Sequence, residues 1–246
     1  MSEIPRTYPS WLKGEVKSAQ KEYTEPTKLL ADDGTLLSPG WARHMVFDYD
    51  RTKSTPTMRR KEWDFYQISD GRYMIQISFA NISIGGTLTA PTALFLGGKD
   101  KYVLPPKGDV PNHVKMEVNG IGKATFDVLT EEHKRTIYFK SGKVECHFEM
   151  DIPDGLENIT TVLPFKDDPK SYFMTTKQNC MPCSGTYKWG DKVYKFSKDD
   201  TFCCLDWGRV NTPYKLVWYW GNGSTYLTDE NGNKHIFGFE ITWGIG

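Results

Sequence analysis

The sequence predicts an all-β protein of the sandwich or barrel type, on three observations. Apolar and polar residues alternate with a period of two in many short segments, a pattern that puts successive side chains on opposite faces of a strand. Turn residues separate these segments at intervals of about 8–12 residues, a spacing typical of sandwiches and barrels. No long amphipathic pattern interrupts them, and an aromatic content of 14% suits pleated sheets.

The first half of the chain holds the clearest strand patterns. The predicted strands span residues 61–68, 72–84, 114–118, 123–128, 135–140 and 143–150. Asn119-Gly120 and Ser141-Gly142 are hairpin turn sequences, so the strands that flank each of them are expected to pair.

The same pattern continues beyond Pro169. The predicted strands there span residues 172–176, 184–189, 192–197, 201–206, 214–220, 225–228 and 234–243. Both faces of segment 214–220 are largely apolar, so we expect a central strand there.

We expect three parts along the chain. Residues 1–39 are rich in breakers and predict an N-terminal arm, with a short helix at 11–23. A first β domain is expected at 40–165 and a second at 170–246. The chain ends on an apolar strand, whose unpaired edge would need a cover. We therefore expect either a shortened chain with an incomplete second domain or a partner subunit, such as a second copy, over that edge.

Charge and cysteine content bear on partners and location. Lys+Arg and Asp+Glu are 31 each, so nothing in the net charge favours a nucleic-acid partner. No signal peptide and no apolar stretch of about 18 residues is seen, so no membrane span is expected. Five cysteines, an odd number that includes the adjacent Cys203 and Cys204, indicate reduced thiols and a cytoplasmic protein.

Metal and cofactor motifs are weak or missing. Cys180 and Cys183 form a single CxxC, whereas structural zinc needs four ligands. Cys203 and Cys204 are adjacent on a predicted strand, so their thiols point to opposite faces. No nucleophile elbow, phosphate loop or dinucleotide motif occurs. We expect no metal and no cofactor.

Two dipeptides pair a carboxylate with an indole, Trp63-Asp64 and Asp206-Trp207. Neighbours on a strand point to opposite faces, so one member of each pair is expected to point inward. An inward Asp needs an arginine or several donors to offset desolvation. The candidate partners are Arg59, Arg60 and Arg209.

These charged residues allow two interpretations. Asp64 or Asp206 with Arg209 forms a structural ion pair at a barrel rim, or one of the aspartates is a buried acid at the end of an apolar pocket. Six aromatic residues are candidate walls of such a pocket, and core packing is the competing interpretation. They are Trp63, Tyr66, Trp207, Tyr214, Trp218 and Trp220.

Several longer motifs point to a known family. They are GWARH (40–44), RRKEWDFY (59–66), CMPCSG (180–185), DTFCCLDWGR (200–209), YKLVWYWGNG (214–223) and FGFEITWGIG (237–246). Together they resemble the domain-of-unknown-function family 2804, and residues 24–43 resemble its opening segment. Cys183 stands where this family is expected to have a small residue such as alanine, which weakens a metal role for the CxxC further.

The resemblance implies a lipocalin-like fold. It also implies a distant similarity to the carotenoid hydratase (hydroxyneurosporene synthase) group, which is built from two consecutive lipocalin-like barrels. The predicted fold class is therefore all-β, with two consecutive lipocalin-like antiparallel barrels or strongly curved sheets, the second possibly incomplete.

Three functions are compatible with this prediction. The first is binding of a small apolar ligand such as a lipid or isoprenoid. The second is an enzyme that hydrates or isomerises such a ligand, with Asp206 or Asp64 as the acid and Arg209 orienting it. The third is a non-catalytic role in assembly. We take the first as the leading hypothesis, because the fold alone does not indicate that the protein catalyses a reaction.

Overall fold

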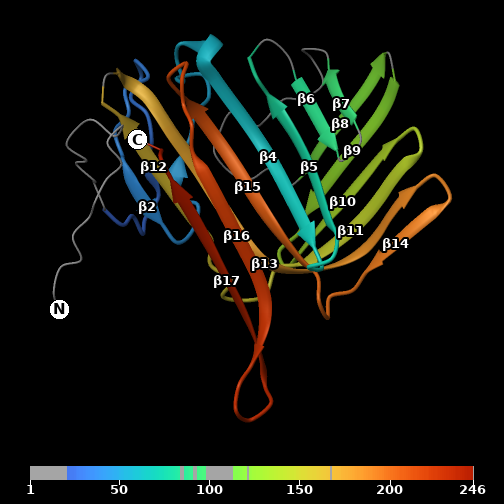
Figure 1. Ribbon diagram of the computed structural model, residues 1–246. Helices are drawn as coiled ribbons and strands as arrows, with labels where there is room; N and C mark the ends of the chain where they lie inside the picture. Colours follow the sequence, from blue (N-terminus) through green and yellow to red (C-terminus); the bar gives the residue numbers. More distant parts are fainter. Residues whose placement is uncertain are drawn as a thin grey trace.

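The computed structural model describes residues 21–83, 86–90, 93–97, 113–120, 122–166 and 168–245. Within these ranges the regular secondary structure is all strand apart from one 3₁₀ turn, η1, at Thr57–Arg59 (Figure 1). No helix in the described ranges has the length and apolar character needed to cross a membrane. The helix predicted at 11–23 falls almost wholly outside the described residues. The all-β prediction is confirmed.

The strands follow the predicted alternation in most places. In chain order they are β1 Thr27–Lys28, β2 Gly40–Ala42, β3 Phe47–Asp48, β4 Arg60–Ser69, β5 Met74–Asn81, β6 Gly86–Ala90, β7 Ala93–Gly97, β8 His113–Gly120, β9 Gly122–Thr130, β10 Lys134–Ser141, β11 Val144–Asp151, β12 Ile159–Phe165, β13 Asp168–Trp189, β14 Lys192–Phe196, β15 Phe202–Asn211, β16 Tyr219–Thr228 and β17 Lys234–Trp243. The hairpins expected at Asn119-Gly120 and Ser141-Gly142 are present as β8–β9 and β10–β11.

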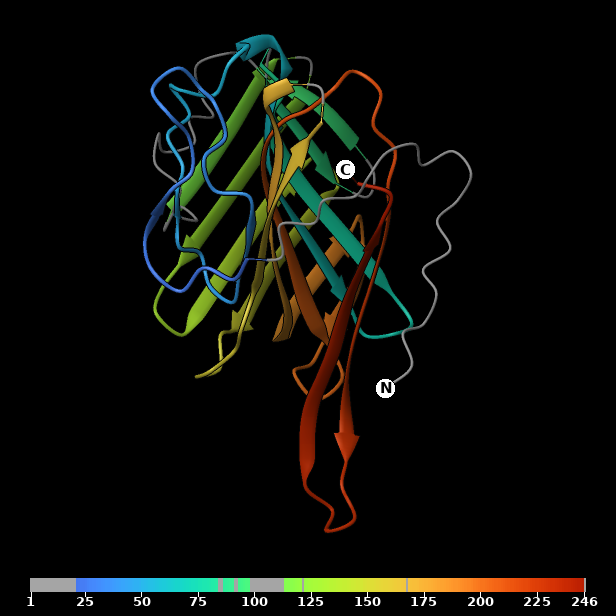
Figure 2. The same cartoon turned by 90° about the vertical axis from the view of Figure 1, so that its left-hand side faces the viewer.

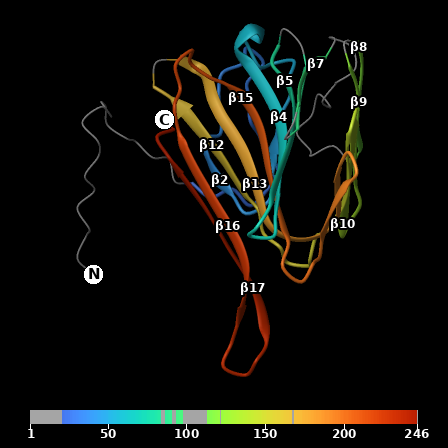
Figure 3. The same cartoon turned by 45° about the vertical axis from the view of Figure 1, so that its right-hand side comes forward.

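Most of the described strands form one continuous, strongly curled sheet (Figures 1 and 3). Its path runs β7-β6-β5-β4-β15-β13-β11-β10-β9-β8, with β12 and β14 joined to β13 and β2 joined to β12. The two ends of the path, β7 and β8, contact each other. The sheet therefore has an inner face, which is enclosed by the curl, and an outer face.

The long strand β13 connects the two walls of the curl. Its first part pairs with β12 and β15, and its last part pairs with β11 and β14. The register shifts between Gln178 and Met181, where Cys180 has a φ of 63°, a conformation typical of a bulge. Two separate strands at 172–176 and 184–189 were expected, and that prediction was wrong because the chain stays paired through the bulge.

The inner face carries the core. Alternation along β4 gives buried residues at every second position, and β10 and β11 do the same from the opposite wall. The buried apolar side chains of both walls include Tyr66, Ile68, Ile75, Ile77, Phe126, Val128, Ile137, Phe139, Phe148, Met150, Met174, Leu205 and Trp207. Burial of this set supplies the main driving force for closing the curl.

Strands β16 and β17 form a separate two-stranded hairpin that lies over the outer face and projects beyond the sheet (Figure 2). The predicted central strand at 214–220 was wrong. Residues 212–218 are not strand, and Tyr214 and Val217 are 91% and 71% exposed. In this segment Trp218 packs on Phe173 of the outer face instead.

The boundary predicted near residues 165–170 coincides with the connection between β12 and β13. Strands on both sides of it pair within the same sheet, with β15 between β4 and β13. The division into a first and a second domain stays a prediction, since no break in strand pairing marks it.

Candidate functional site

The pairing of β4 with β15 positions both Asp–Trp dipeptides. Trp207 lies opposite Asp64 in the register, and Gly208 lies opposite Trp63. Asp64 and Trp207 point into the inner face and are 1% and 0% exposed. Trp63 and Asp206 point to the outer face. One member of each dipeptide is therefore inward, as the alternation predicted.

Asp64 and Arg209 form a buried ion pair on the inner face. Arg209 donates from Nη1 and Nη2 to Asp64 Oδ1, at 3.2 and 3.3 Å. The same Nη1 donates to the carbonyl oxygens of Trp63 and Gly208, both at 2.9 Å. Burial raises the pKa of Asp64, and Arg209 and Arg135 oppose this rise. The pair lies within the core and not at a rim.

Trp207 packs against the Asp64–Arg209 ion pair. The Arg209 guanidinium lies 4.0 Å from the centre of the Trp207 ring, a cation–π geometry. The indole Nε1 is buried and has no hydrogen-bond partner among the described residues, and the same is true of Asp64 Oδ2. Each of these atoms could form one further hydrogen bond.

The glycine of the tetrad Asp-Trp-Gly-Arg, Gly208, has a packing role. A Cβ at Gly208 would overlap the ring of Trp63, so the glycine lets that indole lie flat on β15. Trp63 is then held on the outer face against Phe173, with ring centres 5.8 Å apart.

Arg135, which the sequence patterns did not single out, reaches the same region from the opposite wall. It is 2% exposed and lies on β10, on the face shared with Ile137 and Phe139. Its Nε donates to Thr130 Oγ1 at 3.0 Å, its guanidinium lies 5.8 Å from the Tyr66 ring centre, and its Nη1 has no described partner. The sequence signal that could have identified Arg135 is its charge at a position of β10 where the alternation predicts an apolar residue.

We use the term inner cluster for Asp64, Arg209, Trp207, Tyr66 and Arg135. Beside it, Tyr49 donates to Glu62 Oε1 at 2.7 Å, and Glu62 Oε2 pairs with Arg51 at 2.8 Å. Glu62 is fully buried, and this second pair anchors the segment before β4 to the inner face.

Asp206, the third charged candidate, lies away from the inner cluster. On the outer face it pairs with Lys177 and accepts a bond from Thr175 Oγ1 at 3.1 Å. The sequence interpretation that placed Asp206 and Arg209 in one site is therefore not matched by their positions on opposite faces of β15.

Residues of the β16–β17 hairpin contact Lys177 and Cys204 on the outer face of the sheet. Lys177 Nζ lies 4.7 Å from the Trp220 ring centre, and Trp220 Nε1 donates to Glu240 Oε2 at 2.6 Å. Cys204 Sγ donates to Glu240 Oε1 at 3.1 Å. Burial raises the pKa of Glu240 and of Cys204. These contacts attach the hairpin to the sheet.

The six aromatic candidates do not line one pocket, because they lie on different faces of the sheet. Tyr66 and Trp207 belong to the inner cluster. Trp63, Trp218 and Trp220 lie on the outer face, where Trp218 packs on Phe173 at 5.6 Å. Tyr214 is 91% exposed, and its ring is 5.5 Å from the Arg59 guanidinium. Contact of these six residues with a ligand stays a prediction.

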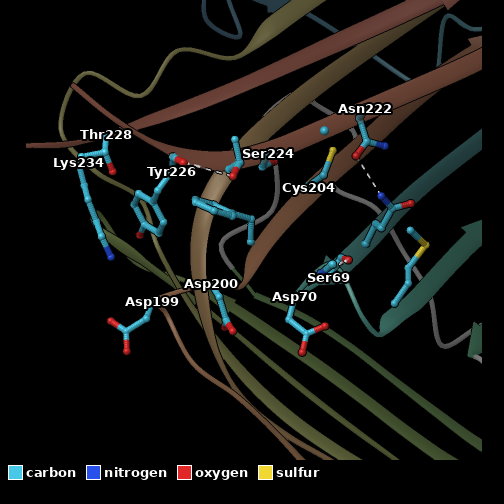
Figure 4. Close-up of a pocket in the computed structure, with 16 residues that line it drawn as sticks. Ser69, Asp70, Asp199, Asp200, Cys204, Asn222, Ser224, Tyr226, Thr228 and Lys234 are labelled. Atoms are coloured by element: carbon cyan, nitrogen blue, oxygen red, sulfur yellow. Dashed lines mark hydrogen bonds between the residues drawn. The ribbon is translucent and has the colours of Figure 1, made fainter. Parts of the chain in front are cut away.

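A cleft of about 520 Å³ lies between the hairpin, the β4–β5 turn and the start of β15. Figure 4 shows Asp70, Asp199 and Asp200 on one side of this cleft and Asn222 and Ser224 on the other. Its polar and acidic lining does not suit an apolar ligand.

The five cysteines all lie within the described residues and form no disulfide bridge. All five are free and buried, and Cys203 and Cys204 point to opposite faces, as expected. Among the described residues no group of three or more His, Cys, Asp or Glu side chains is placed to hold a metal ion.

Comparison with known proteins gives one match. Residues 20–246 match the model of the family described as "Domain of unknown function (DUF2804)". The chain belongs to the DUF2804 family. No curated protein and no solved structure matches it. The family match covers both walls of the curled sheet and the hairpin, so the inner cluster lies wholly within the DUF2804 region.

In this DUF2804 member the two partners of the buried ion pair come from two separate sequence motifs. The motifs that carried the resemblance include Asp64 in RRKEWDFY and Arg209 in DTFCCLDWGR, which the structure brings together as an ion pair. The implied similarity to lipocalins and to carotenoid hydratases stays a prediction.

Proposed function

We propose that this protein binds a small, largely apolar ligand, such as a lipid or isoprenoid, inside the curled sheet. The inner cluster carries this proposal. It is a buried charged group contributed by both walls of the curled sheet, and polar atoms of Asp64, Trp207 and Arg135 have no described partner. Native proteins rarely bury such atoms without a reason, and a ligand with a polar end would supply one.

Native mass spectrometry of the purified protein, followed by solvent extraction, tests this proposal. We expect a co-purified apolar molecule, or a mass shift when isoprenoids or fatty acids are added. A protein that shows neither would contradict ligand binding. A variant with Lys140→Met, on the exposed side of β10, is the control and should bind as the native protein does.

A second candidate function is hydration or isomerisation of an unsaturated ligand by Asp64. The observation in its favour is that burial raises the pKa of Asp64, the direction that favours the protonated acid. Asp206 is less suited, since Lys177 pairs with it on the outer face. Farnesol incubated with the protein in D₂O would gain deuterium, and an Asp64→Asn variant would abolish the gain. Equal exchange in both proteins would rule this function out.

A third candidate function is assembly through the hairpin. The register of β16 and β17 places six large apolar side chains on the outward face of the hairpin. Each of these side chains is between 45% and 68% exposed. They are Tyr219, Leu227, Phe237, Phe239, Ile241 and Trp243. At roughly half of a 200 Å² side chain each, they offer roughly 600 Å² per copy, near the ~800 Å² that a standard interface buries on each partner.

The partner that this face best fits is a second copy of the chain. Sedimentation velocity over a concentration series should show a dimer, which Ile241→Glu should dissociate and Thr228→Glu, at the hairpin tip, should not. A monomer at all concentrations would contradict assembly by this face. We also propose a cytoplasmic location, which the five free thiols support because reducing compartments keep thiols unpaired.

A further inference from the structure

One charged group of the inner face has no counter-charge among the described residues. Arg209 pairs with Asp64, and Arg51 pairs with Glu62. Arg135 is as deeply buried as these groups, but its one described side-chain hydrogen bond goes to the neutral Thr130. No described carboxylate lies within ion-pair distance of Arg135. Arg135 is therefore a nearly fully buried guanidinium without a carboxylate partner among the described residues.

The groups without a partner are mostly donors. Arg135 Nη1 and Trp207 Nε1 can only donate, and Asp64 Oδ2 is the one acceptor of the inner cluster without a partner among the described residues. Trp207 lies directly opposite Asp64 in the register, and Arg135 lies over Tyr66, two positions along β4 from Asp64. The three groups thus lie in one region of the interior, and the ligand group that fits it must accept hydrogen bonds.

Two head groups satisfy both donors, a hydroxyl and a carboxylate. A hydroxyl would also donate to Asp64 Oδ2, but it would leave the unpaired charge of Arg135 buried. A carboxylate would neutralise Arg135 and leave one acceptor unsatisfied. A buried charge without a counter-charge costs more free energy than a buried acceptor without a donor, so the carboxylate fits better.

We propose that the ligand is a monocarboxylate with an apolar tail, of the fatty-acid class, whose carboxylate accepts hydrogen bonds from Arg135 Nη1 and Trp207 Nε1. This inference rests on the proposed function, because it assumes a ligand inside the curled sheet. The apolar residues that share the face of Arg135 on β10, Ile137 and Phe139, lie where a tail would follow.

Calorimetric titration with dodecanoate and with dodecanol, which share one chain length, tests the head group. We expect dodecanoate to bind more tightly than dodecanol. Arg135→Met should weaken dodecanoate binding by about thirtyfold, the effect of removing one partner of a buried charge pair, and should leave dodecanol binding nearly unchanged. Lys140→Met, which removes the same charge from the exposed side of β10, should change neither.

Trp207→Phe is a second variant, which removes the indole N–H together with part of the buried ring and also covers the case in which Arg135→Met does not fold. It should weaken dodecanoate binding several-fold. Equal binding of the two ligands, with no effect of either variant, would overturn the carboxylate assignment and leave ligand binding intact. Absence of binding by both ligands, together with no co-purified molecule, would overturn the proposed function itself.

Discussion

Arg209 donates from both terminal nitrogens to a single oxygen of Asp64, at 3.2 and 3.3 Å, within the interior of the curled sheet. The two side chains are 2% and 1% exposed. Strands β4 and β15, which carry them, are neighbours in space although far apart in the chain. The contact therefore joins an early and a late segment of the protein.

Removal of one partner of this pair should be strongly destabilising. Arg209→Met leaves the Asp64 carboxylate and two carbonyl oxygens without their donor. We expect a loss of about 3–5 kcal/mol in the free energy of unfolding, measured by urea denaturation. The double variant Asp64→Leu with Arg209→Met should recover most of it, since no buried charge remains. A double variant as unstable as the single one would contradict this.

The stability contributed by Asp64 should depend on pH in a definite direction. Burial raises the pKa of Asp64 in the folded state above the unfolded value of about 3.9. Between these two pKa values the folded state binds more protons, so the free energy of unfolding falls as pH rises through that window. Asp64→Asn removes this dependence.

Urea denaturation of the native protein and Asp64→Asn over pH 3–8 provides the measurement. The stability advantage of the native protein should be largest at the acidic end and should shrink as the pH rises. If the advantage grows with pH instead, Arg209 dominates over burial and the pKa of Asp64 is lowered.

Alanine at position 208 should disturb the packing of Trp63. The added Cβ overlaps the indole ring, so we expect Gly208→Ala to cost about 1–3 kcal/mol. Gly221→Ala is the matched control, because nothing lies within 4 Å of its Cβ and the change should stay within about 0.5 kcal/mol. In a Trp63→Leu background the cost of Gly208→Ala should become much smaller. Equal costs in both backgrounds would show that the ring is not the cause.

The cysteine thiols should be unreactive in the folded protein. Burial raises the pKa of Cys146 and of Cys203 to about 12, so almost no thiolate is present at pH 8. We expect Ellman's reagent to modify these two thiols only after urea is added. Rapid modification in buffer would show that the interior opens readily.

Much of the fold could be predicted from the sequence, because period-two alternation reports which residues share a face. The orientation of Asp64 and Trp207 toward one face follows from it directly, and so do the hairpins β8–β9 and β10–β11. Segment 214–220 misled the same reasoning. Trp218 in this segment packs by its side chain on Phe173 of the outer face, and this contact requires no strand pairing.

The inner cluster was only half predictable. Asp64 and Arg209 could be recognised as candidates because Asp64 adjoins Trp63 and Arg209 follows Trp207 and Gly208. Arg135 joins them from β10 only because the sheet curls, with β13 carrying a register shift next to Cys180 between its pairings with the two walls. Periodicity within one strand carries no information about which side chains meet across such a curl.

The position of β15 between β4 and β13 also bears on how the chain is made. Ser69 of β4 pairs with Phe202 of β15, 133 positions later. At a synthesis rate of about 5–20 residues per second, one edge of β4 waits roughly 7 to 27 s for its neighbour to leave the ribosome. During that time a half-apolar strand presents open backbone groups to other nascent chains. The protein should therefore fold late in its synthesis and rely on chaperones until β15 is inserted.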